Sequence, residues 1–263
     1  MALSIIVMGA AGRMGSTIAR LVTEADDLVL AAVLERPEAV DRLQGFKASG
    51  ALVSGDISTV LPACPGAVII DFTSPEASMA TARAGAAHGN PVIIGTTGFS
   101  DEQLAELDAL AQKSLIFRSA NMSVGINVIM DILPRLTELL GDAYDVEMME
   151  IHHNKKKDAP SGTALLLADP LLKAKGLTRD DINTNRFDVR EPRRHAEIGI
   201  QSLRGGDVVG VHTVYYMGPG ERIEITHQAH SRENFANGAL RAARWIGSQK
   251  PGRLYTMQDV LHN

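Results

Sequence analysis

Apolar positions follow two different patterns along the chain, and the pattern changes after Asn121. Before that point, short continuous apolar runs alternate with longer amphipathic segments. The runs predict strands at residues 3–8, 28–34, 68–72, 91–95 and 115–119, and the segments predict helices at residues 14–24, 75–88 and 101–113. Ser100 and Gln103 form a capping-box pattern at the start of the third helix. Buried strands that alternate with helices predict a parallel sheet covered on both faces.

After Asn121 the strands follow one another and show more alternation. Strands are expected at residues 145–153, 198–203, 207–217 and 221–229, with turns at 204–206 and 218–220, and helices at 124–140 and 161–175. Pro170 should kink or end the second of these helices. Residues 178–197 are polar and arginine-rich, and indicate a long loop. We therefore expect a mixed or antiparallel sheet here, and a helix at residues 234–248 that returns to the first domain.

Composition narrows the class of protein without naming a function. The 263 residues are 45% hydrophobic and 22% charged, and the net charge of −5 argues against a nucleic-acid or anionic-membrane binder. The single cysteine, Cys64, cannot form an intrachain disulfide, which fits a reducing compartment. We find no signal-peptide pattern and no apolar run of membrane-spanning length, so a soluble, cytoplasmic protein is expected.

A glycine-rich turn lies between the first predicted strand and the first predicted helix. Gly9, Gly12 and Gly15 let the chain approach a pyrophosphate, which the helix N-terminus would bind. Glu35 follows Gly15 by 20 residues, where an acidic residue meets the adenosine ribose, and Arg36 could pair with a 2′-phosphate. A plain glycine turn is the alternative for the motif alone. With this context we expect a Rossmann-like α/β domain that accepts NADH, NADPH or both.

Two later strand ends carry polar or glycine-rich residues. They are the segments at residues 71–73 and 95–99. Ligands of open α/β sheets bind at the carboxyl ends of the strands, so both segments are expected to face the ligand. Ordinary strand-end turns are the alternative.

Residues 150–164 place a cation, a proton donor and a helix N-terminus close together. The histidines at 152 and 153 can exchange a proton near neutral pH, and a lysine of the run 155–157 can bind a carboxylate. The turn at residues 161–163 opens a helix whose N–H groups can hold a second anionic group. This combination suits reduction of an anionic unsaturated substrate. As an alternative, residues 155–157 form a solvated loop. His152 and His153 point to opposite faces of the strand, so in the alternative reading at least one of them is structural or only faces the ligand. The spacing does not fit a metal site.

The other histidines give a weaker signal. For His212, His227 and His230 we favour a structural role over a role at the site. Arg232, just before the last predicted helix, could reach a cleft between the domains.

Several motifs together resemble the dihydrodipicolinate reductase family. They are GAAGRMG at residues 9–15, GTTGF at 95–99, EIHHNKKKDAPSGTA at 150–164, SLRGGDVVGVHTV at 202–214 and HSRENFANGA at 230–239. The resemblance implies NAD(P)H-dependent reduction, with loss of water, of 4-hydroxy-tetrahydrodipicolinate to tetrahydrodipicolinate in the diaminopimelate route to lysine. It also implies a homotetramer built through the sheet of the second domain. The dinucleotide-binding domain would comprise residues 1–122, completed by 233–263, and the substrate-binding and oligomerisation domain residues 123–232.

The resemblance also implies roles for individual residues. His152 is similar to the general acid, and Lys156 to the group that stabilises charge on the substrate. The dicarboxylate substrate would be held by His153, Lys156, Ser161, Gly162 and Thr163. The cofactor would be held by Gly9, Gly12, Arg13, Met14, Gly15, Glu35, Arg36, Phe72, Gly95, Thr96, Thr97, Ala120, Asn121, Met122 and Arg232.

Two positions depart from the family pattern. Met122 stands where many relatives carry an aromatic residue near the nicotinamide, and Asp169-Pro170 interrupts a helix that is usually continuous. Three rival functions remain open at this point. They are a dehydrogenase acting on an aspartate-like amino acid, a nucleotide-sensing module without turnover, and a scaffolding protein.

Overall fold

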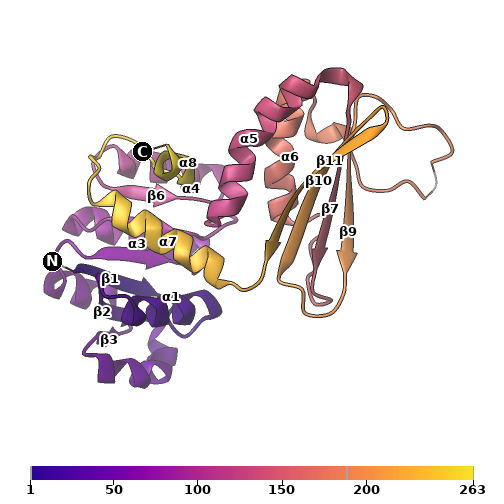
Figure 1. Ribbon diagram of the computed structural model, residues 1–263. Helices are drawn as coiled ribbons and strands as arrows, with labels where there is room; N and C mark the ends of the chain where they lie inside the picture. Colours follow the sequence, from indigo (N-terminus) through magenta and orange to yellow (C-terminus); the bar gives the residue numbers. More distant parts are fainter. Residues whose placement is uncertain (1, 188, 263) are drawn as a thin grey trace. The chain divides into compact units, whose positions relative to one another are not determined.

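The computed structural model describes residues 2–187 and 189–262. The chain forms two compact units, the first from Met1–Ser123 and Arg232–Asn263 and the second from Val124–Ser231 (Figure 1). No helix among the described residues is long and apolar enough to cross a membrane.

The first unit is built on a six-stranded parallel sheet in the order β3-β2-β1-β4-β5-β6. The strands are β1 (Leu3–Met8), β2 (Leu28–Leu34), β3 (Leu52–Ser54), β4 (Val68–Asp71), β5 (Val92–Ile94) and β6 (Ile116–Arg118). The central strands are almost wholly buried, because helices cover both faces, as the continuous apolar runs predict. The order reverses between β1 and β4, which is the topological switch point where such sheets bind ligands.

The first unit has six α-helices and two 3₁₀ segments among the described residues. They are α1 (Arg13–Glu24), α2 (Ile57–Val60), α3 (Pro75–His88), α4 (Asp101–Ala111), α7 (Glu233–Ile246) and α8 (Met257–Leu261), with 3₁₀ segments η1 (Pro37–Ser49) and η2 (Leu61–Ala63). The predicted capping box at Ser100 and Gln103 is present at the start of α4. Helix α7 packs against α1, and Arg244 bonds both carboxylate oxygens of Asp27 at 2.6 and 2.8 Å.

The second unit has a five-stranded mixed sheet in the order β11-β10-β7-β9-β8. The strands are β7 (Asp145–His152), β8 (Ile182–Asn183), β9 (Ile198–Arg204), β10 (Gly210–Gly218) and β11 (Glu221–Ala229). Strand β10 runs antiparallel to β7 and β11, whereas β9 runs parallel to β7 and β8. Helices α5 (Val124–Leu140) and α6 (Gly162–Lys175) form an apolar core with one face of this sheet.

Two sequence expectations differ from this unit, and its strand order is a further finding. Helix α6 continues through Pro170, because Leu167, Ala168, Leu171 and Leu172 are buried around it and their packing outweighs the lost hydrogen bond. Strands β9 and β10 are consecutive but do not pair, since β7 lies between them. Residues 178–197 are not wholly loop: they contain the 3₁₀ turn η4 (Arg179–Asp181) and strand β8.

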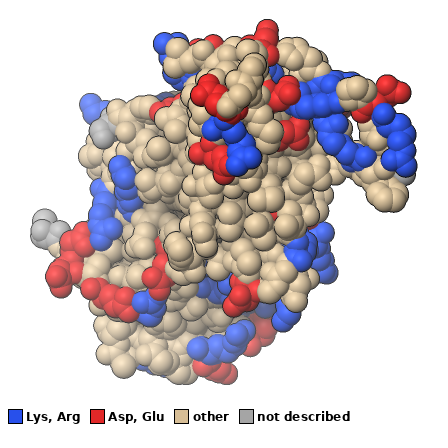
Figure 2. Space-filling model, turned by 45° about the vertical axis from the view of Figure 1, so that its right-hand side comes forward, with Lys and Arg blue, Asp and Glu red and all other residues tan. Residues whose placement is uncertain are grey.

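The basic residues of this segment are balanced locally. Arg193 bonds Glu147 at 2.7 Å and Asp145 at 2.8 Å, and Glu197 accepts from Arg186 and Arg194. Figure 2 accordingly shows acidic side chains beside the densest group of Lys and Arg on the face drawn.

Candidate active site

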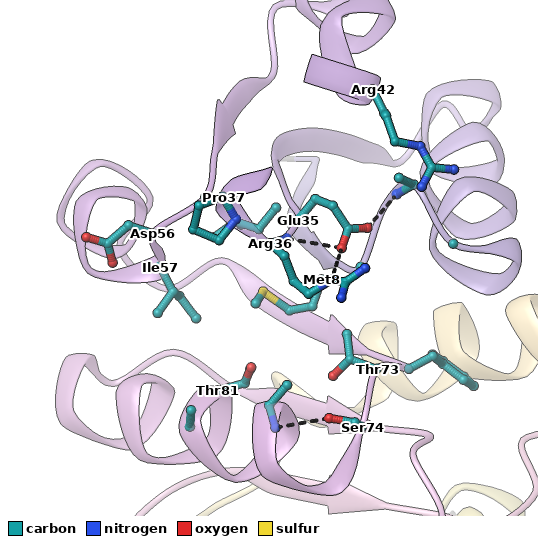
Figure 3. A pocket seen from close by; sticks show the side chains of 18 of the residues that line it. Met8, Glu35, Arg36, Pro37, Arg42, Asp56, Ile57, Thr73, Ser74 and Thr81 are labelled. Atoms are coloured by element: carbon teal, nitrogen blue, oxygen red, sulfur yellow. Dashed lines mark hydrogen bonds and ion pairs between the residues drawn. The ribbon is translucent and has the colours of Figure 1, made fainter. Parts of the chain in front are cut away.

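The first unit contains a pocket of about 1000 Å³ at the carboxyl ends of β1, β2 and β4 (Figure 3). Six residues that the sequence predicts as cofactor contacts line it, namely Gly9, Gly12, Arg13, Glu35, Arg36 and Phe72. The pocket therefore lies at the topological switch point of the sheet, where a dinucleotide binds in this fold class.

The glycines of the turn have separate physical functions. Gly9 adopts φ +64°, a left-handed conformation that favours glycine, and accepts the N–H of Gly12 at 2.9 Å. A Cβ on Gly15 would lie 2.2 Å from the carbonyl oxygen of Gly9. Gly15 is therefore required for the close packing of α1 on the turn, and it does not line the pocket.

The N-terminus of α1 opens onto this pocket. Gly12 is its N-cap residue and no side chain of the described chain caps the helix. The first N–H groups of a helix have no acceptor within the helix and carry a partial positive charge. The arrangement can therefore bind a phosphate group, which the sequence predicts.

Glu35 lies at the end of β2, within reach of the glycine-rich turn. Its carboxylate accepts the N–H of Ala11 at 3.1 Å and the N–H of Arg36 at 3.0 Å. Its side chain is only 12% exposed. The same carboxylate thus orders the turn and offers oxygens to a ligand hydroxyl group.

Two arginines lie at the end of the pocket that holds Glu35 (Figure 3). Arg36 is shared between Glu35 at 3.8 Å and Glu38 at 3.5 Å. Arg42, from η1, makes no ion pair within the described part of the chain. Arg42 was not predicted as a site residue, because no periodic pattern placed residues 37–49 near the turn.

A buried polar network supports the ends of β4 and β5. Asp71 accepts from Thr73 at 2.6 Å and from Ser78 at 2.9 Å, and Ser78 in turn bonds Thr96 at 2.7 Å. Thr96 is thus directed into the protein, whereas Thr97 is exposed. A ligand at this edge would meet Thr97 before Thr96.

The remaining predicted cofactor residues lie outside the pocket lining. A Cβ on Gly95 would lie 2.1 Å from the Phe72 ring, so Gly95 makes room for that ring. Met122 is buried, and a Cβ on Gly238 of α7 would lie 1.7 Å from its carbonyl oxygen. The lining residues contain none of Met14, Gly15, Gly95, Thr96, Thr97, Ala120, Asn121, Met122 and Arg232. Arg232 is the N-cap residue of α7.

The second unit brings charged side chains together through the register of three strands. Glu150 pairs with Ser202 of β9 and with His212 of β10, and His152 pairs with Arg204. Alternate residues of a strand share a face, so these side chains lie on the same face of the sheet as the apolar core of α5 and α6. His212, expected to be structural, lies against His152 with a distance of 5.1 Å between the ring centroids.

Glu150 is the centre of this cluster. Its oxygens contact His152 Nδ1 at 2.6 Å and accept from the two terminal nitrogens of Arg204 at 2.8 and 2.7 Å. Burial raises the pKa of Glu150, but the hydrogen bonds from Arg204, Ser202 and His152 outweigh it and lower this pKa to about 2. Glu150 is therefore an ionised carboxylate at neutral pH.

Both histidines are neutral at pH 7 in this arrangement. Burial lowers the pKa of His152, and although Glu150 opposes this, Lys156 and Arg204 add to the lowering. Burial, with the neighbouring His152, lowers the pKa of His212 to about 3. A neutral His152 next to an ionised carboxylate carries its proton on Nδ1 and leaves Nε2 as an acceptor.

The anion-binding groups that the sequence predicts already meet a carboxylate. Lys156 Nζ lies 2.8 Å from Asp158 Oδ2, and the backbone of Gly162 also hydrogen-bonds Asp158. The side-chain bond from Lys156 is the main cause of a lowered pKa at Asp158. These groups thus show that they can hold a carboxylate at the N-terminus of α6.

Ser161 joins the two parts of this site. Its Oγ accepts the N–H of Ala164 at 3.1 Å and so caps α6, and it also contacts His212 Nε2 at 3.0 Å. Its own N–H donates to Glu150 at 3.1 Å.

Two further predicted substrate residues lie nearby in the chain. Thr163 lies in the first turn of α6, and the N–H of His153 donates to the carbonyl oxygen of Val208. Among the described residues no group of His, Cys, Asp or Glu is arranged to hold a metal ion.

Sequence reasoning missed Glu150, Arg204 and Asp158 as site residues. Glu150 stands two residues before His152, so it shares a strand face with it, and this spacing could have indicated a partner. Arg204 and His212 enter only through strand register, which no local pattern reveals.

Comparison with known proteins gives matches over nearly the whole chain. The family model for the N-terminal part of dihydrodipicolinate reductase matches residues 3–122, and the model for its C-terminal part matches residues 125–261. The 4-hydroxy-tetrahydrodipicolinate reductase of Nitratidesulfovibrio vulgaris strain DP4 is 60% identical, covering 99% of this chain and 100% of the relative. The same enzyme of Lawsonia intracellularis is 50% identical, again over 99% and 100%.

Solved structures agree on the fold. Dipicolinate-bound dihydrodipicolinate reductase from Paenisporosarcina sp. TG-14 has a TM-score of 0.76 at 22% identity, covering 97% of this chain and 98% of that one. A probable dehydrogenase from Thermotoga maritima has a TM-score of 0.65 at 14% identity, covering 98% and 92%. The expected combination of a parallel Rossmann-like sheet and a smaller mixed sheet is confirmed. The chain belongs to the dihydrodipicolinate reductase family.

Proposed function

We propose that this protein catalyses the NAD(P)H-dependent reduction of 4-hydroxy-tetrahydrodipicolinate to tetrahydrodipicolinate, with loss of water, in the diaminopimelate route to lysine. The observation that carries the proposal is the cluster at the end of β7. It joins a buried histidine, a lysine and a carboxylate-binding helix N-terminus in a chain 50–60% identical to reductases of that name.

The pocket of the first unit fits a dinucleotide. The positive φ of Gly9 and the close approach at Gly15 require glycine at these positions, and Gly12 is the N-cap residue of α1, so no side chain at these three positions keeps a pyrophosphate from the N-terminus of α1. Glu35 would accept the ribose hydroxyl groups, and Arg36 and Arg42 would face a 2′-phosphate, which supports use of both NADH and NADPH. The bound nicotinamide would supply the hydride.

The other predicted cofactor residues extend this proposal beyond the pocket. Gly95 and Thr97 follow the end of β5, the strand next to β4, and the segment 120–122 follows the end of β6, the strand next to β5. We assign them to the nicotinamide end, together with Arg232. Thr96 would act on this end indirectly, by holding the strand ends through Ser78 and Asp71.

The cluster of the second unit would bind the substrate through its two carboxylates. Lys156 and the backbone N–H groups at residues 161–163 would hold one carboxylate, in place of Asp158. His153 would contact the substrate from the same loop. The positive charges of Lys156 and of the helix N-terminus would also stabilise negative charge that develops on the ring.

His152 would complete the reaction by protonating the carbon next to the reduced position. Its pKa is lowered in the ligand-free protein, so His152 must gain a proton as the substrate binds. A dianionic substrate supplies the reason, because nearby negative charge favours imidazolium and raises its pKa. Substrate binding and proton uptake are thus coupled.

We further propose a cytoplasmic homotetramer formed through the second unit. The sheet face away from α5 and α6 carries partly exposed apolar side chains, including Leu203 at 45% and Met217 at 38%. An apolar sheet face of this kind is typical of an interface between subunits.

The direct test follows nicotinamide absorbance while the preceding synthase generates the substrate from pyruvate and aspartate semialdehyde. We expect oxidation of NADH and of NADPH that requires the synthase and is inhibited by pyridine-2,6-dicarboxylate. Cofactor binding without oxidation would instead support a nucleotide sensor or a dehydrogenase for another substrate. No cofactor binding at all would support a scaffolding role.

A further inference from the structure

Glu150 is a buried carboxylate that has no role in the reaction as proposed above. Its side chain is 1% exposed, and burying a carboxylate is costly unless several groups bond to it. It neither lies in the loop at residues 153–160 nor belongs to the groups expected to touch the substrate. Its position in the middle of the cluster therefore calls for a separate explanation.

One carboxylate connects both halves of the site. Oε2 contacts His152 Nδ1 at 2.6 Å, and Oε1 accepts the N–H of Ser161 at 3.1 Å. Ser161 is the N-cap residue of α6, so Glu150 bonds at once to the proton donor and to the start of the anion-binding helix. A shift of either half would break a bond to a buried charge.

Arg204 holds Glu150 in this position. Its two terminal nitrogens bond the two carboxylate oxygens at 2.8 and 2.7 Å, which fixes the plane of the carboxylate. One of them also donates to the carbonyl oxygen of Asp158 at 2.6 Å. Arg204 therefore anchors the pair to the loop that carries Lys156.

The other ring nitrogen of His152 is left for the substrate. Nε2 makes no hydrogen bond within the described residues, and it lies beside Gly210, where a Cβ would come within 3.0 Å of it. An acceptor on Nδ1 fixes the ring and keeps the proton of the neutral form on Nδ1, so a second proton taken up on Nε2 is directed at the substrate.

We propose that Glu150, held by Arg204, is the positioning residue of this site: it fixes the tautomer and orientation of His152 and locks His152 to the first turn of α6. The inference deepens the proposed reductase function and rests on it for the role of His152. The arrangement itself makes a prediction that needs no turnover. Neutral His152 carries its proton on Nδ1.

The first test reads the tautomer by ¹⁵N NMR of histidine-labelled protein at neutral pH, with the signal assigned by its loss in His152→Gln. We expect the Nδ1–H form in the natural protein. In Glu150→Gln the amide oxygen turns to Arg204 and the amide NH₂ donates to Nδ1, so the proton moves to Nε2. A natural protein in the Nε2–H form would overturn the proposal even if no variant folds.

The second test compares kinetics of Glu150→Gln with Glu197→Gln. Glu197 is a matched control, because it is also a buried glutamate of this unit paired with arginines but contacts no histidine. We expect Glu150→Gln to lower kcat by about 10²-fold or more with a small change in KM, as for a misplaced general acid. Glu197→Gln should lower stability and leave kcat near its natural value.

The pH profile separates positioning from mere structural support. Glu150, Arg204, Lys156 and His212 are the charged and titratable groups that face His152. The Glu150 charge favours the protonated form of His152. Its loss should therefore move the basic limb of the pH profile of kcat to lower pH by about one unit. An unmoved limb with retained kcat would overturn the proposal. Absence of turnover in the natural protein would overturn the reductase function alone, since the tautomer is read without turnover.

Discussion

The two candidate sites of this chain depend on different structural features. The pocket of the first unit depends on space and backbone: a positive φ at Gly9, a close approach at Gly15 and the N–H groups that open α1. The cluster of the second unit depends on buried charged side chains, with Glu150, Arg204 and His152 brought together from β7 and β9.

This difference predicts how each site fails. The pocket of the first unit depends on free space around the backbone, so it is sensitive to added side-chain volume and almost insensitive to pH. A site made of buried charge is sensitive to protonation and to the loss of one partner, because the other charge is then left unpaired. Substitutions and pH can therefore be used to damage one site at a time.

The largest effect is expected from volume added to the turn of the first unit. In Gly15→Ala the new Cβ would stand 2.2 Å from the Gly9 carbonyl oxygen, so α1 must move away from the turn. We expect NAD(P)H affinity to fall by about 10²-fold and the free energy of unfolding by about 2 kcal/mol. Fluorescence titration and urea unfolding measure both. Gly45→Ala is the control, since nothing lies within 4 Å of its Cβ, and equal effects in the two variants would contradict the account.

Acid should damage the second unit first. Glu150 has a pKa of about 2 when folded and 4.5 otherwise, so its contribution, about 3 kcal/mol, is complete above pH 4.5 and is lost as the pH falls towards 2. His212 is neutral when folded, with a pKa of about 3, and protonates below 6.5 when unfolded, so stability already declines from pH 6.5 downwards.

Among the described carboxylates of the first unit whose pKa is lowered, none is buried as deeply as Glu150: Asp259, which bonds Arg253 and Thr256, is 16% exposed. Asp27 and Glu106 are in exposed ion pairs, which contribute little to stability. Hydrogen exchange, corrected for intrinsic rates, should show β7 and β9 losing protection at a higher pH than β1 and β4. The reverse order would contradict the proposed difference between the sites.

A smaller effect is expected where Asp158 occupies the anion-binding groups. Its carboxylate pairs with Lys156 and hydrogen-bonds Gly162, so it competes with a ligand carboxylate. We expect Asp158→Asn to bind pyridine-2,6-dicarboxylate about 3- to 10-fold more tightly, as the loss of one such competitor implies. Calorimetric titration measures this. Asp169→Asn, on the same unit and paired with Arg179, should change nothing, and weaker binding by Asp158→Asn would refute the competition.

The smallest effect concerns the choice of cofactor. Arg36 is shared with Glu35 and Glu38, whereas Arg42 forms no ion pair within the described residues. We therefore expect Arg42→Ala to raise KM for NADPH by about 3- to 10-fold and to leave KM for NADH unchanged, with a smaller effect from Arg36→Ala. Equal changes for both cofactors in Arg42→Ala would mean that this arginine does not face a 2′-phosphate.

The same contrast explains what the sequence could predict. Five of the six strands of the first unit, its four longer helices and six residues of its pocket follow from local periodicity and from a contiguous glycine turn. Residues 37–63 gave no such pattern, because they form 3₁₀ segments and short elements without a clear apolar face, so Arg42 was missed.

In the second unit the local motif identifies His152 and Lys156 but not what holds them. Arg204 and His212 reach Glu150 only because β7 lies between β9 and β10, although β9 and β10 are consecutive in the chain. Strand order is a non-local property, and the glycines at 205 and 206 suggested a tight turn instead. Pro170 shows the same limit, since tertiary packing decides that α6 continues.

The central claim is that cofactor binding and proton donation use separate sites. The most direct test measures two properties of the variants His152→Ala and Lys156→Ala. NAD(P)H binding is followed by fluorescence titration, and synthase-coupled turnover is followed on the same samples. If the two sites are separate, cofactor affinity should be unchanged and turnover should be lower by about 10²-fold or more, the range for loss of a general acid. Near-normal turnover in both variants, with cofactor binding intact, would contradict it.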